Sequence, residues 1–323
     1  MTSSQATVAT LIPAYKTKYI GELLVGLALQ TRRSDRIIIS DDSPDGEFGR
    51  LLDSPALAGL RAGLPIEIHP GPRNGAYENF KHLIKLWGDS SDFVHLLLDD
   101  DLIYPEFYEQ HLGGHRQGRF SCSISARWTA AENGQPIRGM PVPLAVKADP
   151  ARLLALDAGV MFTTTVPECK NWFGEFSNCI LTRETAPLLL KPEFEGVSYA
   201  GLWDLGAFLA ASLVAPVLYI QERLGAFRTG GEGHSAQLMG KHMKAAHLGY
   251  SALALGGKRL GQLSAEQARQ CYAGIAPALV QRYADQTDMQ GFAQLLFRMA
   301  AGEDAAEAEF LDQWHGFLAS HQL

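Results

Sequence analysis

The sequence predicts an α/β protein with a doubly wound, mostly parallel sheet and a helical extension at its C-terminal end. Over the first hundred residues, short apolar runs alternate with segments whose apolar residues recur at helical spacing. This alternation is typical of a parallel sheet covered by helices. From Ser264 onward the chain is rich in Ala, Leu and Gln, which predicts helices.

Four apolar runs rich in branched residues predict the strands of this sheet. They are residues 8–13, 36–40, 65–69 and 93–98. Helices are predicted between them, at residues 19–31, 48–60 and 77–87. Polar or acidic turns follow three of the strands, and the carboxyl ends of parallel strands lie at one edge of a sheet. We therefore expect these turns to meet at that edge.

The pattern is less regular between residues 106 and 200. Residues 120–126 predict a strand, and Asn133-Gly134 predicts a hairpin turn. Asp149-Pro150 predicts the start of a helix, with Asp as the cap and Pro in the first position.

Further along, residues 202–213 predict a helix and residues 216–220 a strand. Ser264 and Gln267 have the spacing of a capping box, and Gly302 and Gly316 are expected to interrupt the helices that follow. The Gly-rich stretch near residue 230 predicts a boundary between a domain of residues 1–235 and a helical region of residues 236–323.

The composition is that of an ordinary globular protein, with 46% hydrophobic residues and a net charge of 28 − 35 = −7. No Lys/Arg block is present, so nucleic acid is not an expected partner. The four cysteines lack metal-ligand spacing and predict free thiols. No signal-peptide pattern begins the chain, and the apolar stretch 205–220 is short for a membrane span. A cytoplasmic protein is predicted, and association with the inner face of a membrane stays open.

Three consecutive aspartates, Asp99, Asp100 and Asp101, follow the apolar run 93–98. Three neighbouring carboxylates repel one another unless a cation lies among them. Ligands of open α/β sheets bind outside the carboxyl ends of the strands. A hard divalent cation that holds a phosphate would explain the cluster, and all-oxygen ligation favours Mg²⁺ or Mn²⁺. The alternative is a solvated acidic turn that caps the next helix.

Six motifs occur in a fixed order along the chain. They are Thr10 to Tyr15, Ile39 to Ser43, Arg73-Asn74-Gly75 with Asn79, Leu98 to Asp101, Trp203-Asp204, and Phe227-Arg228 with His234. Over about residues 6–235, this order resembles a family 2 glycosyltransferase with a GT-A fold. Two positions depart from the family pattern, because Trp203 stands where an acid is common and His234 lies further from Arg228 than usual.

The resemblance implies a metal-dependent, inverting transfer of a sugar from a nucleotide-diphosphate donor to a hydroxyl group. A UDP-sugar is the favoured donor, and the acceptor is a glycan, a lipid-linked group or a protein hydroxyl. A role in the synthesis of surface polysaccharide or glycoconjugates is implied by the family alone.

The same resemblance assigns roles to individual residues. Metal ligands are expected at Asp101, Asp99 and His234. Nucleotide-sugar contacts are expected at Pro13, Ala14, Tyr15, Asp41, Asp42, Arg73, Asn74, Asp99 and Asp100. Asp204 is expected to be the general base, and Trp203 and Asn178 are expected to contact the acceptor.

Structural alternatives stay open for several of these residues. Asp41 and Asp42 can form a simple Asx turn, and Tyr15 can be a core residue. Arg73 can be an ordinary surface residue, and Asp204 can serve the N-terminus of its helix.

Two other functions compete with a glycosyltransferase. A nucleotidyltransferase would use strand-end aspartates, but a Gly-rich basic loop is usual near its first strand, where this chain has Pro13-Ala-Tyr-Lys-Thr17. A non-catalytic nucleotide-sugar or glycan-binding module is the second alternative. A scaffold that binds a partner through the C-terminal helices belongs to the same non-enzyme alternative. The tail from Ser264 to Leu323 could equally form a homodimer interface, the wall of an acceptor site or a dock on a membrane surface, and a solvated helical face is the default.

Overall fold

The computed structural model describes residues 5–229 and 237–323. The chain divides into two compact units, and each takes alternate segments of the sequence. Unit 1 comprises Met1–Leu156, Phe173–Leu190 and Val214–Thr229. Unit 2 comprises Asp157–Trp172, Lys191–Leu213 and Gly230–Leu323. The sequence predicts one domain boundary near residue 235, whereas the chain passes between these two units five times.

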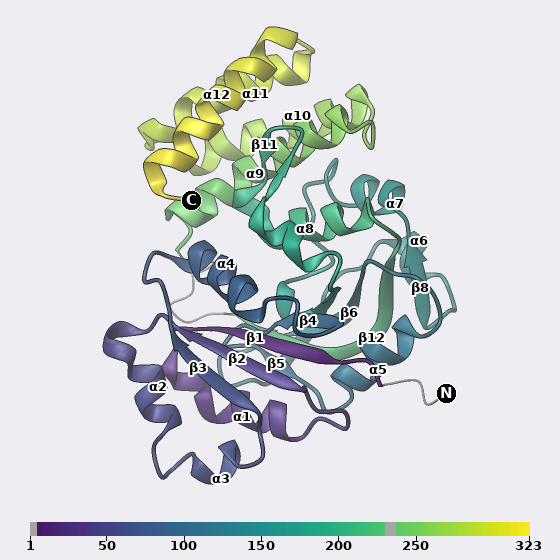
Figure 1. Ribbon diagram of the computed structural model, residues 1–323. Helices are drawn as coiled ribbons and strands as arrows, with labels where there is room; N and C mark the ends of the chain where they lie inside the picture. The colour runs from purple at the N-terminus through teal and green to yellow at the C-terminus, as the bar shows by residue number, and fades with distance from the viewer. Residues whose placement is uncertain (1–4, 230–236) are drawn as a thin grey trace. The chain divides into compact units, whose positions relative to one another are not determined.

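Unit 1 is built on one mixed sheet, with strand order β3-β2-β1-β4-β9-β6-β12-β5, β7 beside β6 and β8 beside β12 (Figure 1). The strands are β1 (Val8–Ala14), β2 (Arg36–Asp41), β3 (Ile66–Pro70), β4 (Phe93–Leu96), β5 (Leu102–Ile103), β6 (Cys122–Ala130), β7 (Pro136–Gly139), β8 (Leu153–Leu156), β9 (Cys179–Thr182) and β12 (Val217–Arg228). Strands β3, β2, β1 and β4 are parallel, as the alternating pattern predicts. Beyond β4, β9 pairs antiparallel with both β4 and β6, so the second half of the sheet is mixed.

The helices of unit 1 lie on both faces of this sheet. They are α1 (Ile20–Ala28), α2 (Glu47–Leu52), α3 (Ala58–Arg61), α4 (Ala76–Trp87), α5 (Phe107–His115) and α6 (Leu144–Lys147). Helices α1, α2 and α5 bury their apolar residues in one core with β1 and β2, and α4 covers the opposite face (Figure 1). The predicted helix 48–60 is interrupted between α2 and α3, where Pro55 lies in the chain and cannot continue a helix.

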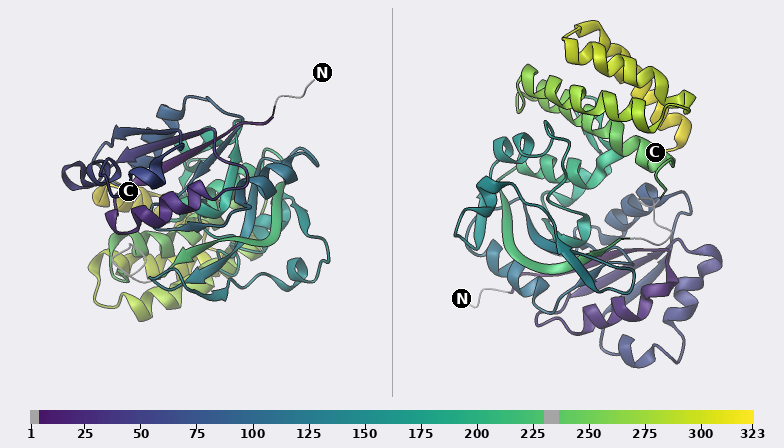
Figure 2. Two further views of the ribbon diagram at one scale, coloured as in Figure 1. Left: turned by 90° about the horizontal axis from the view of Figure 1, so that it is seen from below. Right: turned by 180° about the vertical axis from the view of Figure 1, so that it is seen from behind.

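Unit 2 is mainly helical. Its helices are α7 (Ala158–Thr163), α8 (Trp203–Ser212), α9 (Lys241–Arg259), α10 (Ala265–Arg282), α11 (Thr287–Ala301) and α12 (Asp304–His321), and β10 (Glu193–Phe194) and β11 (Val197–Ser198) form a small hairpin. Helices α9 to α12 pack against one another in sequence (Figure 2). The predicted capping box is confirmed, because the Gln267 N–H donates to Ser264 Oγ and the Ser264 N–H donates to Gln267 Oε1.

Two local predictions are wrong. Asp149-Pro150 does not start a helix, because the Asp149 carboxylate accepts the N–H of Ala151 in a turn and strand β8 follows. The helix begins after Asp157 instead, whose carboxylate accepts the Val160 N–H at 2.8 Å. Gly316 does not interrupt a helix, since it lies within α12. Gly302, in contrast, ends α11 with a φ of 87°, which is the left-handed cap that glycine favours.

The remaining sequence expectations concern the hairpin, the thiols and the membrane. Asn133-Gly134 does form the turn between β6 and β7, and Gly134 has a φ of 81°. All four cysteines are free thiols. Within residues 5–229 and 237–323, no helix combines the length and the apolar character that crossing a membrane requires.

Candidate functional site

The acidic turn after β4 lies beside the end of β1. The two strands are parallel neighbours, and the N–H of Leu97 donates to the carbonyl of Leu11. Past the end of β1, the backbone N–H groups of Tyr15 and Lys16 both donate to Asp99 Oδ2, at 2.6 Å each. The first aspartate of the triad therefore holds the loop that follows the first strand.

Asp99 is a buried carboxyl group whose charged form is disfavoured. Burial, with a further contribution from the charge of Asp100, raises its pKa to about 6. The two backbone N–H bonds and the nearby ammonium group of Lys16 act in the opposite direction and do not cancel the shift.

Asp101 is buried still more deeply, with 2% of its surface exposed. Burial and the charges of Asp100 and Glu175 raise its pKa well above the usual range, although the Ser177 hydroxyl and the N–H of Arg228 favour the charged form. Its Oδ1 accepts the Arg228 N–H at 3.3 Å. Its Oδ2 is buried and accepts no hydrogen bond of good geometry from the part of the chain that the structure describes. One oxygen of Asp101 is therefore buried without a well-formed hydrogen bond from the described residues.

Lys16 is a partly exposed cation at this turn. Its ammonium group forms an ion pair with Asp100, and its side chain is 34% exposed. Although burial lowers the pKa of Lys16, the carboxylates of Asp100, Asp99 and Asp101 together raise it above the usual range. No sequence motif assigned a role to this lysine.

Two buried arginines complete the charges around the triad. The Arg228 guanidinium donates to the carbonyl oxygen of Asp100 at 2.5 Å, forms an ion pair with Glu22, and lies 4.4 Å from the centre of the Tyr19 ring. Burial lowers the pKa of Arg228.

The second arginine, Arg127, pairs with Glu175 at 2.6 Å. Glu175 belongs to the segment before β9, far from the triad in sequence, so no local motif could have identified it.

The acidic turn after β2 has a different environment. Asp41 Oδ1 accepts the Ser43 N–H at 3.0 Å and the Ser43 hydroxyl at 2.5 Å, and Oδ2 accepts the Gly49 N–H at 2.9 Å. Asp42 Oδ1 accepts the Arg73 N–H at 2.6 Å. These bonds are the Asx-type structure that the sequence left open, and they join the turn to the loop after β3.

The other predicted donor-binding residues surround the end of β1 and the loop after β3. Tyr15 is 58% exposed, so the alternative of a core residue is wrong. Ala14 is fully buried and Pro13 partly buried. Arg73, with a φ of 54°, and Asn74 are exposed. The side chains of Tyr15, Arg73 and Asn74 are therefore accessible to a ligand in unit 1.

Asn178, predicted to contact an acceptor, is buried in unit 1. Its Nδ2 donates to the carbonyls of Ser125 and Phe173, at 2.7 and 2.8 Å, and its Oδ1 accepts the Glu175 N–H at 2.9 Å. The amide thus positions the segment that carries Glu175.

The predicted base and its neighbour belong to unit 2. Asp204 is partly buried in the first turn of α8, and its Oδ1 accepts the Leu205 N–H at 2.7 Å. Trp203 is buried. Burial and the charge of Asp204 raise the pKa of Tyr250, which lies on α9. His234, predicted as a metal ligand, lies outside the described residues.

A metal ion is compatible with the oxygen atoms that this turn provides. Asp101 offers its buried Oδ2, and Asp99 has one oxygen that does not accept the N–H bonds of the β1 loop. Over the described ranges, no group of three His, Cys, Asp or Glu side chains has the arrangement of a complete metal site. Mg²⁺ typically takes one or two protein carboxylates and completes its shell with phosphate and water, so two carboxylates fit such an ion.

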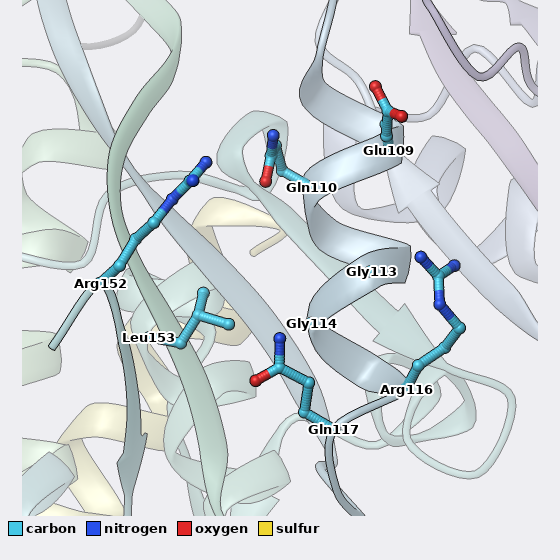
Figure 3. Close-up of a pocket in the computed structure, with 8 residues that line it drawn as sticks. All are labelled: Glu109, Gln110, Gly113, Gly114, Arg116, Gln117, Arg152 and Leu153. Atoms are coloured by element: carbon cyan, nitrogen blue, oxygen red, sulfur yellow. The ribbon is translucent and has the colours of Figure 1, made fainter.

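A cavity of about 580 Å³ lies elsewhere in unit 1, between α5 and the start of β8 (Figure 3). Gln110, Gln117 and Arg152 extend into it around the glycines of α5 (Figure 3). A Cβ atom at Gly114 would meet Leu218 at 2.3 Å, so this helix lies against the beginning of β12. The aspartate triad lies at the other end of β12, near Arg228. The cavity and the triad are therefore separate features.

Comparison with known proteins gives a likeness in structure and none in sequence. No model of a protein family matches this chain, and no protein of curated function matches it significantly. The structure is similar to that of S. aureus TarS residues 1–349 in complex with UDP-GlcNAc, with a TM-score of 0.54 and 12% identity over 98% of this chain and 91% of that one.

Two further TarS structures give the same result. The complex of residues 1–349 with UDP has a TM-score of 0.56 at 12% identity, over 98% of this chain and 91% of that one. The longer S. aureus TarS chain has a TM-score of 0.56 at 13% identity, over 97% of this chain and 53% of TarS. Together with the sheet of unit 1, this likeness establishes that the chain has a GT-A fold with a C-terminal helical region.

Proposed function

We propose that this protein is a family 2 glycosyltransferase that transfers a sugar from a nucleoside-diphosphate donor to a hydroxyl group. The observation that carries the proposal is the pair of buried carboxylates, Asp99 and Asp101, whose charges are poorly compensated at the edge of the sheet. The order of six sequence motifs supports the family. The likeness in fold to TarS, which has been solved with UDP and with UDP-GlcNAc, supports a uridine nucleotide in the donor.

The donor would bind at the end of β1. The exposed Tyr15 ring, beside the backbone of Pro13 and Ala14, offers a face for a nucleotide base. The exposed guanidinium group of Arg73 can stack on a base or bind phosphate. Asp41 and Asp42 would act through the turn that they hold in place.

A divalent ion, Mn²⁺ or Mg²⁺, belongs to this proposal, with Asp101 as the direct ligand and Asp99 as its neighbour. Such an ion neutralises charge on a leaving diphosphate. The orphaned Oδ2 of Asp101 supports this assignment, because a buried oxygen without a donor is stabilised by a cation.

The reaction would be a single displacement that inverts the anomeric carbon. The acceptor oxygen forms a bond to that carbon while the bond from the carbon to the diphosphate oxygen breaks. Asp204 takes the proton of the acceptor hydroxyl, and the nucleoside diphosphate leaves. This role for Asp204 rests on its place in the Trp203-Asp204 motif.

The test is binding and hydrolysis of a panel of nucleotide sugars, first with Mn²⁺ and then with a chelator. We expect metal-dependent cleavage of one donor, lost in Asp101→Ala. Asp204→Asn should bind this donor as the wild type does and fail to transfer its sugar to an acceptor. Full transfer by Asp204→Asn would remove the assignment of the base.

Other outcomes of the same panel support the competing functions. Release of pyrophosphate from a nucleoside triphosphate and a sugar phosphate would identify a nucleotidyltransferase. Tight donor binding with neither hydrolysis nor transfer would identify a binding module. Failure to bind any nucleotide sugar, with or without metal, would overturn the proposed function.

A further inference from the structure

Lys16 is placed where a negatively charged ligand of the triad would be held. Its backbone N–H donates to Asp99 at 2.6 Å, and its side chain forms an ion pair with Asp100. Both the backbone and the side chain of Lys16 thus contact the same acidic turn. Lys16 lies two residues after the end of β1, at the sheet edge where ligands of such sheets bind.

The buried arginines at this turn are already engaged. Arg228 pairs with Glu22 and donates to the carbonyl of Asp100, and only 3% of its side chain is exposed. Arg127 pairs with Glu175 and has 5% of its side chain exposed. Both guanidinium groups are themselves buried, and turning Arg127 toward a ligand would also leave the largely buried Glu175 unpaired, which is costly.

Lys16 differs from both arginines in its accessibility. Its side chain is 34% exposed and that of its partner Asp100 is 21% exposed. A lysine has a flexible stem and three donors, so the ammonium group can contact a ligand at little cost to the fold. This ion pair is partly exposed, so breaking it costs less than breaking a fully buried pair.

We propose that Lys16 binds the diphosphate of the donor and so supplies a built-in positive charge beside the metal. This inference rests on the proposed function, because it takes a nucleoside diphosphate as the ligand. The inference adds Lys16 to the divalent ion as a second positive group that binds the diphosphate. Nucleotide binding then keeps part of its affinity when the divalent ion is removed.

Lys18 provides a matched control two residues away. Its ammonium group pairs with Glu132, and its side chain is 62% exposed. Lys18 belongs to the same loop and carries the same charge, but no contact joins it to the aspartate triad in the described structure. Replacing it changes the net charge of the loop without changing the charge at the triad.

The experiment measures the affinity for UDP by calorimetry, with EDTA and then with Mn²⁺, for the wild type, Lys16→Met, Lys16→Arg and Lys18→Met. In EDTA we expect Lys16→Met to weaken UDP binding about tenfold or more, the size of effect usual for a hydrogen bond to a charged group. Lys16→Arg should recover most of the affinity, and Lys18→Met should bind as the wild type does. The urea midpoint of each variant reports on its folding.

Each result has a distinct meaning. Equal UDP affinity of Lys16→Met and the wild type in EDTA would overturn the inference and leave the proposed function standing. An equal loss in Lys18→Met would show a general effect of net charge and would also overturn it. If the wild type binds none of UDP, GDP and dTDP in either condition, the proposed function fails and the inference fails with it.

Discussion

Two acidic turns follow strands of the same sheet, Ser40 to Ser43 after β2 and Leu98 to Asp101 after β4. In the first, Asp41 accepts three hydrogen bonds from its own turn and helix, and Asp42 accepts the N–H of Arg73. In the second, Asp99 and Asp101 are buried with raised pKa values, and Asp101 Oδ2 accepts no hydrogen bond of good geometry from the described residues. Strand ends thus determine where carboxylates gather, and the number of nearby donors determines whether they build structure or remain available to a ligand.

The largest expected effect separates the two turns by function. Asp101→Asn should lower sugar transfer by about 10²- to 10³-fold, as the loss of one electrostatic stabiliser does. Its free energy of unfolding should stay equal or rise, because the substitution removes a poorly compensated buried charge. Turnover of the donor and urea unfolding measure the two quantities. If Asp101→Asn retains sugar transfer but loses much of its free energy of unfolding, Asp101 has a structural role like that of Asp41.

The converse is expected for the turn after β2. Asp41→Ala leaves the N–H groups of Ser43 and Gly49 without their acceptor, and should lower the free energy of unfolding by about 2 kcal/mol. Urea unfolding measures this change. If Asp41→Ala unfolds as the wild type does and yet loses UDP binding, the contrast between the two turns breaks down.

A smaller effect tests the link from this turn to the loop after β3. A Cβ atom at Gly71 would lie 2.3 Å from Asp42 Oδ1 and 3.0 Å from the carbonyl oxygen of Asp41. Gly71→Ala should therefore cost about 1–2 kcal/mol of stability. Gly59→Ala is the matched control, since a Cβ there meets nothing within 4 Å, and it should leave the urea midpoint unchanged or slightly higher.

The smallest expected effect is the pH dependence that Asp99 adds in metal-free protein. Its folded-state pKa of about 6 exceeds the value of about 3.9 expected for an unfolded chain. The folded protein therefore binds more protons between these values, and its stability falls as the pH rises through that window. From pH 5 to pH 7, the wild type should lose about 1 kcal/mol relative to Asp99→Asn.

Urea unfolding in EDTA at the two pH values measures this difference. Comparison with Asp99→Asn is needed because burial lowers the pKa of His95 to about 3 and that of His115 to about 4. Those histidines change stability with pH in both proteins, so their contribution cancels. Identical pH profiles for the two proteins would mean that the N–H groups of Tyr15 and Lys16 compensate the burial of the Asp99 carboxylate.

The sequence was sufficient to locate the acidic edge of the sheet. Alternating strands and helices placed the turns after β2 and β4, and apolar spacing located helix α4 to within one residue. The motif Phe227-Arg228 singled out Arg228, but its contacts with the triad could not be predicted, because the partners of the triad come from distant segments. Glu175 precedes β9, and Arg228 ends a strand β12 that is longer than the predicted 216–220. Polar residues and bulges after Ile220 conceal the rest of that strand.

Helix α9 lies within the predicted helical region 236–323, but no individual helix was predicted there, and its glycines explain why. A Cβ at Gly256 would meet Phe194 at 2.9 Å, and one at Gly257 would meet Leu263 at 2.9 Å. These positions require a residue without a side chain for close packing, although glycine weakens the helical signal in a sequence. Close packing thus requires glycine at these two positions of α9, although the helix propensity of glycine is low.

The alternation of the two units along the chain has a consequence for protein synthesis. The last segment assigned to unit 1 ends at Thr229, whereas α9, which packs against the short turn Ala200–Leu202 directly before α8, comes after it. Nearly every residue of α8 is buried in the folded protein. Translation adds about 5–20 residues per second, so on the ribosome the segment 200–212 waits several seconds for α9, whereas α7, which packs against α8, is already made. During that interval a chaperone that recognises exposed apolar segments would find its target in residues 203–212.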